Sequence, residues 1–203
     1  VSLTGIMTNE LTARHNNGAL LADLRNTARD ENLKYAEVLG INPSAAITCV
    51  KPSGTVSQLV DTSSGIHPAY AHHYIRRVQC DVKDPLTTFM INAGVPHEPL
   101  STKPDQVMVL EFPQKSSPGA ITRHDLGAIE QLEIWHTYRT HWCDHNPSCT
   151  IYVREDEWLD VAAWVWRNFD DCGGLSFLPY DGGTYKQAPY EEITEDRYTA
   201  LVG

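Results

Sequence analysis

The sequence predicts an α/β fold with buried, largely parallel strands. Segments with strand-like composition alternate along the chain with segments in which apolar residues recur at helical spacing. Several of the strand segments, such as 45–50 and 149–153, are largely apolar, which is typical of strands covered on both faces. Together, the alternation and the apolar strands indicate one α/β domain.

Four elements are expected before residue 61. Residues 1–7 form a strand or the end of one. In residues 19–39, apolar side chains recur at helical spacing and Gly40 supplies a stop, which together predict a helix. Residues 45–50 form a buried strand, and a tight turn then leads into a short helix over 56–60.

The middle of the chain predicts further strands and helices. The strand candidates are 74–80, 107–112 and 149–153. Pro85 begins a helix that runs to Ala93, and the longest helix candidate starts near Asp125. Three aromatic residues of this long helix lie on one stripe, which we expect to face the core: Trp135, Tyr138 and Trp142.

The last part of the chain predicts two helices and one strand. The first helix carries an apolar face that we also assign to the core: Trp158, Val161, Ala162, Val165 and Phe169. A strand at 175–178, a loop at 181–185 and an amphipathic helix at 193–201 follow. The acidic pairs are interpreted as solvated: Asp170 with Asp171, and Glu191 with Glu192.

Composition limits the classes of function. The chain has 203 residues and a formal net charge of −10, from 26 acidic and 16 basic residues. This charge argues against general binding to nucleic acids or anionic membranes, and no apolar stretch approaches the roughly 20 residues of a membrane helix. Five widely spaced cysteines without a CxxC motif indicate reduced thiols, and the start shows no secretory signal pattern, so we expect a cytoplasmic protein.

Both ends of the sequence fall next to predicted elements. The sequence starts at Val1 inside an apolar run and stops at Gly203 directly after a helical segment. We therefore expect a piece of a larger protein, with residues 1–203 forming a single partial domain.

The turn after the strand at 45–50 is a candidate phosphate site. The first amides of a helix lack intrahelical partners and lie where the helix dipole is positive, so they suit an anion. Gly54 has no side chain to keep a ligand from the backbone. The candidate binding residues are Ser53, Gly54, Thr55, Val56 and Ser57. The pattern alone leaves an ordinary helix cap as an equal alternative, and it differs from a Walker motif because Lys51 precedes the glycine.

Other polar residues carry no catalytic assignment. Four residues of metal-ligand type follow no common zinc spacing, so no metal site is expected: His141, Cys143, His145 and Cys149. Arg76 and Arg77 are neighbours in a predicted strand, so at most one of them faces a substrate phosphate. A surface ion pair is the alternative for these arginines.

Seven short motifs are spread over nearly the whole chain in a specific order and spacing. They are Val1-Ser2-Leu3-Thr4-Gly5-Ile6-Met7, Lys51-Pro52-Ser53-Gly54-Thr55-Val56-Ser57, Ser63-Ser64-Gly65-Ile66-His67-Pro68, Tyr74-Ile75-Arg76-Arg77-Val78, Ser148-Cys149-Thr150-Ile151, Leu178-Pro179-Tyr180-Asp181-Gly182-Gly183 and Gln187-Ala188-Pro189. With this set, the chain resembles adenosylcobalamin-dependent (class II) ribonucleotide reductases of the ribonucleoside-triphosphate reductase type.

The resemblance implies the C-terminal part of a ten-stranded α/β barrel, in which the turn at 53–57 binds the phosphates of a ribonucleotide. In that family, homolysis of the Co–C bond of adenosylcobalamin generates a thiyl radical on a finger-loop cysteine. The radical abstracts the 3′-hydrogen, and a cysteine pair supplies the electrons that replace the 2′-hydroxyl by hydrogen. The implied partners are the ribonucleotide, the missing N-terminal part of the barrel and a thioredoxin-type reductant.

The residues of the radical step have no counterpart in this sequence. The family's finger-loop cysteine lies in an Asn-Pro-Cys-Gly-Glu type motif, whereas Cys149 lacks the Gly-Glu and is assigned to packing. We therefore expect no turnover by the chain alone. Two alternatives stay open: a non-catalytic nucleotide- or phosphate-binding module, and a structural half-barrel that becomes competent only with its N-terminal portion.

Overall fold

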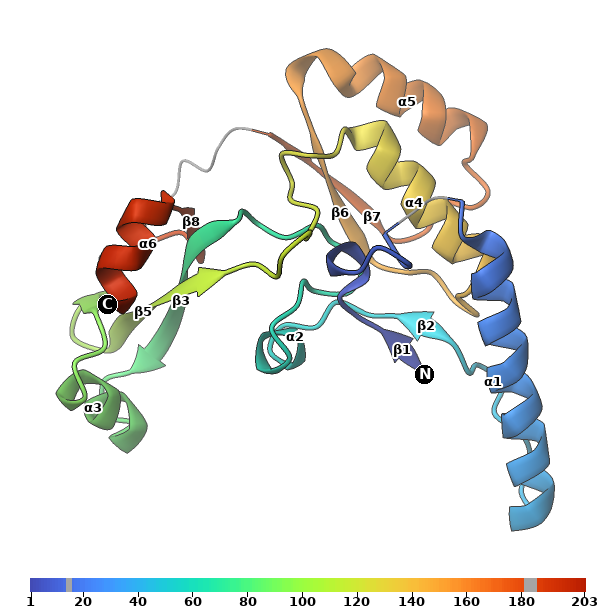
Figure 1. Cartoon of the computed structure of the whole chain (residues 1–203), viewed down its shortest axis with the longest axis horizontal. Helices are drawn as coiled ribbons and strands as arrows, with labels where there is room; N and C mark the ends of the chain where they lie inside the picture. The colour runs from blue at the N-terminus through green and yellow to red at the C-terminus, as the bar shows by residue number, and fades with distance from the viewer. Residues whose placement is uncertain (14–15, 181–185) are drawn as a thin grey trace. The chain divides into compact units, whose positions relative to one another are not determined.

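The computed structural model describes residues 1–13, 16–180 and 186–203. The chain divides into two compact units, of which unit 1 consists of residues 1–69 and 117–180. Unit 2 consists of residues 70–116 and 181–203 (Figure 1). The loop expected at 181–185 lies outside the described residues. The assignment of 1–203 to one partial domain stays a prediction.

Unit 1 contains two pairs of parallel strands. β1 (Ser2–Leu3) pairs with β2 (Cys49–Val50), and β6 (Cys149–Val153) pairs with β7 (Leu175–Pro179). Every second residue of β6 is buried, so one face of this strand lies in the core. The parallel pairing predicted from the apolar strands is confirmed in this unit.

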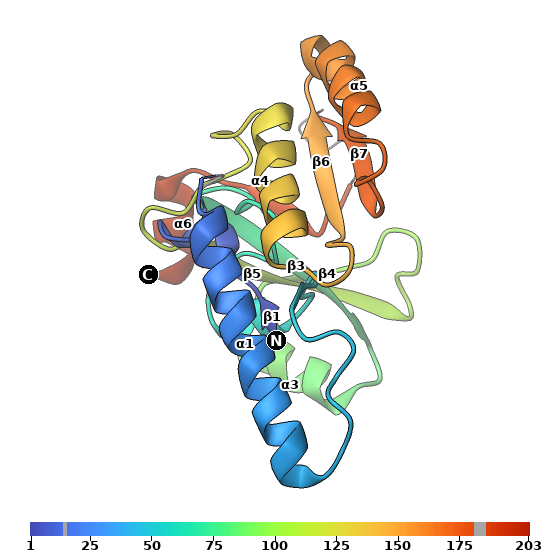
Figure 2. The ribbon, with the colours of Figure 1, turned by 90° about the vertical axis from the view of Figure 1, so that its right-hand side faces the viewer.

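The helices of unit 1 gather around α4 (Ala128–His141), which packs against β6. α1 (Gly18–Leu39) lies with its N-terminal part next to the C-terminal end of α4, where Arg25 donates to the Thr140 carbonyl at 3.3 Å (Figures 1 and 2). α5 (Trp158–Arg167) contacts α4 as well. Three one-turn helices complete the unit: η1 (Ile6–Thr8), α2 (Val56–Leu59) and η2 (Glu155–Glu157).

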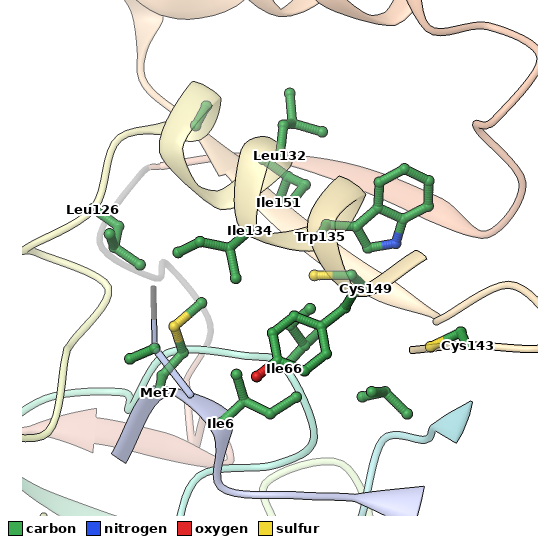
Figure 3. Packing of buried hydrophobic residues seen from close by; sticks show 14 of the residues in the cluster. Ile6, Met7, Ile66, Leu126, Leu132, Ile134, Trp135, Cys143, Cys149 and Ile151 are labelled. Atoms are coloured by element: carbon green, nitrogen blue, oxygen red, sulfur yellow. The ribbon is translucent and has the colours of Figure 1, made fainter. Parts of the chain in front are cut away.

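The core of unit 1 forms where α4 and β6 meet the N-terminal segment. Leu132 and Trp135 of α4 and Ile151 of β6 are buried there together with Ile6 and Met7 of η1 (Figure 3). The predicted aromatic stripe of α4 is confirmed, because its three members are at most 3% exposed: Trp135, Tyr138 and Trp142.

Only part of the predicted apolar face of α5 lies in the core. Trp158 and Phe169 are 40% and 69% exposed, so their assignment to the core is wrong. Ala162 is exposed as well. Val161 is buried and Val165 packs against the core, as predicted. The prediction left out Trp164, which is buried and donates its indole N–H to Glu133 of α4 at 2.6 Å. This hydrogen bond turns the Trp164 side of α5 toward α4, and Phe169 lies beyond the helix end.

Unit 2 is organised by an antiparallel sheet with strand order β4-β5-β3-β8. The strands are β3 (His73–Asp81), β4 (His97–Pro99), β5 (Val107–Lys115) and β8 (Tyr190–Glu192). The expectation of largely parallel strands is wrong here. Most residues of β3 and β5 are half-buried, as is typical of an antiparallel sheet with one solvated face.

Two helices with side-chain caps accompany this sheet. In α3 (Pro85–Asn92), the preceding Asp84 side chain accepts from the Leu86 N–H at 2.8 Å, and Pro85 fills the first position, where no N–H is needed. In α6 (Glu195–Val202), Thr194 caps the first turn. The predicted helices at 85–93 and 193–201 are therefore present, with ends shifted by one or two residues.

Candidate functional site

The predicted phosphate turn lies between β2 and the one-turn helix α2 in unit 1. Gly54, Thr55 and Val56 are exposed, whereas Ser57 is buried. A Cβ atom placed on Gly54 would meet no described atom within 4 Å, so neighbouring side chains do not fill this corner. The turn therefore has the open backbone surface that an anion site requires.

The backbone amides of the turn also fit an anion site. Within the described part of the chain, the N–H groups of residues 54–57 have no hydrogen-bond partner. The next two amides, of Gln58 and Leu59, donate to the Thr55 carbonyl at 3.0 and 3.3 Å. Four consecutive amides that lack a partner in the described part of the chain, at an exposed helix start, are donors suited to phosphate oxygens.

The side chains of the turn are used partly by the protein itself. The Ser57 hydroxyl donates to the Ser53 carbonyl at 2.8 Å, and the Ser53 hydroxyl lies 2.9 Å from the Thr4 hydroxyl. Of the three hydroxyl groups in the turn, only that of Thr55 is exposed and has no hydrogen-bond partner among the described residues. Ser57 can therefore offer a ligand its N–H but not its hydroxyl in this arrangement.

The segment 63–65 supports the turn from behind. The Ser53 N–H donates to the Ser64 hydroxyl at 2.9 Å, and the Gly65 N–H donates to the Thr4 hydroxyl at 2.9 Å. Gly65 has a φ of 55°, and a Cβ there would lie 2.8 Å from the Lys51 carbonyl oxygen. Only glycine fits this position without strain. The sequence reasoning singled out this segment as a motif but assigned it no role.

A buried carboxylate anchors the strand that leads into the turn. Asp144 accepts hydrogen bonds from the Ile47 and Thr48 amides at 2.8 and 3.0 Å. On its other oxygen it forms ion pairs with Arg25, at 2.8 Å, and Arg29 of α1. Burial alone would raise the pKa of Asp144, but the two amides and two guanidinium groups outweigh it and hold the pKa far below its usual range. Sequence reasoning missed this residue, because its partners lie about a hundred positions away along the chain.

Two cysteines of unit 1, Cys143 and Cys149, are buried. Burial raises the pKa of Cys149 to about 12, and burial raises the pKa of Cys143 to about 11, so both thiols stay protonated at neutral pH. Cys149 lies in the core, which confirms its assignment to packing. Among the described residues, no group of three or more His, Cys, Asp or Glu side chains is placed to hold a metal ion.

The arginine pair of β3 is used within unit 2. Arg77 donates to Glu111 of β5 at 2.7 Å and forms an ion pair with Glu191 of β8, so the ion-pair interpretation is confirmed for this residue. Arg76 lies over the ring of Tyr190, with 4.4 Å between the guanidinium carbon and the ring centre. Glu191 also binds Arg197 at 2.7 Å, so its interpretation as a solvated group is wrong.

The acidic pair in unit 1, Asp170 and Asp171, is exposed, as predicted. Asp171 lies beyond the end of α5 and contacts His136 Nε2 of α4 at 3.1 Å. Asp171 therefore has one partner in α4 and remains exposed to solvent.

Comparison with known proteins gives consistent relatives, although no protein-family model matches the chain. The adenosylcobalamin-dependent ribonucleoside-triphosphate reductase of Lactobacillus acidophilus is 36% identical over 169 residues, which cover 81% of this chain and 22% of the relative. The enzyme of the same name from Euglena gracilis is 34% identical over 171 residues, covering 83% of this chain and 24% of the relative. A crystal structure of a B12-dependent (class II) ribonucleotide reductase superposes with a TM-score of 0.80 at 28% identity, covering 93% of this chain and 27% of that chain.

The resemblance to class II ribonucleotide reductases is confirmed. The fold class predicted from it is confirmed by the same structural match, although the strands of the described residues form three separate sheets and close no barrel. The chain spans about a quarter of the length of these class II reductases. Within the described residues, no helix is both long and apolar enough to cross a membrane.

Proposed function

We propose that this chain is part of an adenosylcobalamin-dependent ribonucleoside-triphosphate reductase of the cytoplasm, in which it supplies barrel strands and the turn that binds the substrate phosphates. One observation carries this proposal: the four consecutive amides of residues 54–57 have no hydrogen-bond partner among the described residues, and Gly54, the first of them, has open space beside it. Named class II reductases match over more than four fifths of the chain, which supports a ribonucleotide as the ligand.

The residues of the turn would act by binding and orientation. Amide N–H groups of Gly54, Thr55, Val56 and Ser57 would donate to phosphate oxygens, and the Thr55 hydroxyl would add a donor. A phosphate tail held in this way fixes the position of the ribose relative to the rest of the barrel, which lowers the entropic part of the barrier.

The radical chemistry belongs to the remainder of the complete enzyme. Adenosylcobalamin would supply the radical that a cysteine outside this chain passes to the substrate, and a thioredoxin-type protein would restore the reduced cysteines. The described residues of this chain present no donor set for a metal ion, and their buried thiols stay protonated. Because the radical cysteine is expected outside this sequence, we expect no deoxynucleotide from the chain alone.

Replacing Gly54 by Val tests the phosphate site. The new side chain points into open space, so we expect stability within about 0.5 kcal/mol of the original but at least about tenfold weaker binding of a ribonucleoside triphosphate in calorimetry. The physical reason is that the added methyl groups occupy the volume where the phosphate oxygens approach the amides.

Two control variants separate binding from folding. Leu59→Ala changes an exposed residue of the same short helix and should leave the affinity unchanged. Gly65→Ala should lower the stability, because it introduces a Cβ 2.8 Å from a carbonyl oxygen. A folded Gly54→Val variant that binds nucleotide as tightly as the original would refute the site. Nucleotide binding at this turn in a protein that is inactive even with its N-terminal part would instead favour the non-catalytic binding module.

A further inference from the structure

The imidazole of His67 joins β6 to the phosphate turn through hydrogen bonds at both ring nitrogens. Its Nε2 lies 3.1 Å from the backbone N of Thr150 in β6, and its Nδ1 lies 3.0 Å from the Ser64 carbonyl oxygen. The Thr150 amide can only donate and the Ser64 carbonyl can only accept. Both contacts are therefore satisfied by one form of the ring only, the neutral tautomer with its proton on Nδ1.

Ser64 carries this connection into the turn. Its carbonyl also accepts from the His67 backbone N–H at 2.9 Å, so the ring and the backbone of one residue together fix the orientation of the 64–65 peptide group. The Ser64 hydroxyl accepts from the Ser53 N–H at 2.9 Å. Ser53 immediately precedes the four unpaired amides, so a chain of three hydrogen bonds runs from Thr150 to the anion-binding backbone.

The surroundings of His67 favour the neutral ring. Burial lowers the pKa of His67 below its ordinary value, and the Ser64 carbonyl opposes this only in part. No charged side chain contributes to this shift. The ring contacts the Thr150 amide of β6 and the Ser64 carbonyl, and Cys149, the residue before Thr150, stays protonated at neutral pH. Adding a proton to Nε2 would place an N–H against the Thr150 N–H and break the connection.

We propose that His67 is a positioning residue for the phosphate turn: its neutral ring holds Ser64, and through it Ser53, in the orientation that exposes the amides of 54–57. This inference rests on the proposed function and extends it, because it makes phosphate affinity depend on the protonation state of a residue that does not touch the ligand. Acidification then weakens binding by breaking the contact between β6 and the 64–67 turn.

The test measures the affinity of the 203-residue chain for inorganic tripolyphosphate by calorimetry, from about pH 8 down to about pH 5, the range in which histidines titrate. In His67→Asn, the amide nitrogen occupies the place of Nδ1 and can donate to Ser64, but nothing in the side chain titrates. In His67→Ala, both contacts are lost, and we expect about fivefold to tenfold weaker binding at neutral pH, the effect of about one hydrogen bond.

The decisive quantity is the ratio of the dissociation constants of the original chain and His67→Asn at each pH, because protonation of tripolyphosphate affects both equally. We expect this ratio to rise several-fold as the pH falls through the pKa of His67. A residue with a merely structural role would give a constant ratio. His145→Asn, at an exposed histidine of the same unit, should leave both affinity and pH profile unchanged.

Two results would overturn the proposal, and they differ from each other. A constant ratio, with tight binding by the original chain, would remove the role of His67 and leave the phosphate site intact. Absence of tripolyphosphate binding by the original chain at every pH would refute the proposed function and the role of His67 with it. If urea titrations show that His67→Ala does not fold, the ratio of dissociation constants between the original chain and His67→Asn still tests the proposal.

Discussion

The two units of this chain are stabilised by different interactions. Unit 1 packs parallel strands and three longer helices around a core of fully buried aromatic and aliphatic side chains. Unit 2 pairs antiparallel strands whose residues are mostly half-buried, and a guanidinium group, that of Arg77, connects three of its strands through Glu111 and Glu191. The contrast shows that an alternating α/β pattern does not by itself tell a covered parallel sheet from a half-solvated antiparallel one.

The same contrast separates the roles of polar contacts. In unit 1, the buried carboxylate of Asp144 and the ring of His67 hold the backbone that precedes and supports the phosphate turn. In unit 2, the ion pairs join strands of one sheet. Three substitutions, two in unit 1 and one in unit 2, test how much each kind of contact contributes to the free energy of unfolding.

The largest effect is expected from Trp135→Ala in the core of unit 1. Trp135 is 0% exposed, and its indole N–H donates to the Pro147 carbonyl at 2.8 Å. The cavity and the lost hydrogen bond should lower the free energy of unfolding by about 3–5 kcal/mol in urea titration. Trp166→Ala, at a residue that is 83% exposed, is the matched control and should change it by less than about 0.5 kcal/mol. Equal effects of the two substitutions would contradict the placement of the core.

The next largest effect is expected from Asp144→Asn. The variant keeps the size of the side chain but removes the charge that two arginines and two amides share, so we expect a loss of about 2–4 kcal/mol of unfolding free energy. Because the pKa of Asp144 is lower in the folded than in the unfolded state, its contribution is complete above the ordinary aspartate range and is lost as the pH falls below it.

The stability of Asp144→Asn should therefore depend less on acid than that of the original chain. A variant with unchanged stability at neutral pH, or with the same loss in acid, would show that the carboxylate does not anchor residues 47–48.

The smallest effect is expected from Arg77→Met in unit 2. Arg77 is 12% exposed, but its partner Glu191 is 34% exposed and keeps Arg197 as a second partner, so water and that partner compensate in part. We expect a loss of about 1–2 kcal/mol.

Amide hydrogen exchange measured residue by residue would show where stability is lost. Arg77→Met should speed exchange in β3 and β5 and leave exchange in β6 unchanged. Arg197→Met, at the more exposed arginine, should have less effect than Arg77→Met. A larger loss of unfolding free energy in Arg197→Met would show that Arg77 is not the main connection between the strands.

The sequence predicted the elements better than their surroundings. The predicted helix at 19–39, the helix predicted from near Asp125 and the strand at 149–153 are long or strongly patterned, and the structure confirms them as Gly18–Leu39, Ala128–His141 and Cys149–Val153. The longest helix is α1, with 22 residues, and not α4 as predicted. The strands β4 and β8 were not predicted, because each has only three residues and carries charges or proline. The prediction for α5 was wrong at Trp158 and Phe169, which are exposed, and it left out Trp164, which is buried. Helical periodicity defines an apolar stripe, but the neighbouring helix decides which edge of that stripe is buried.

The sequence by itself determined the motif order, and with it the resemblance to class II reductases, as well as the turn in which Gly54 leaves the backbone accessible. Only the tertiary structure showed that the amides of 54–57 have no partner among the described residues and that the Ser57 hydroxyl already donates to the Ser53 carbonyl. It also brought Asp144 and His67 to partners 83 to 119 residues away. The physical reason is that local pattern reports the conformational preference of each segment. The partners of a buried polar group, in contrast, are chosen by how distant segments pack.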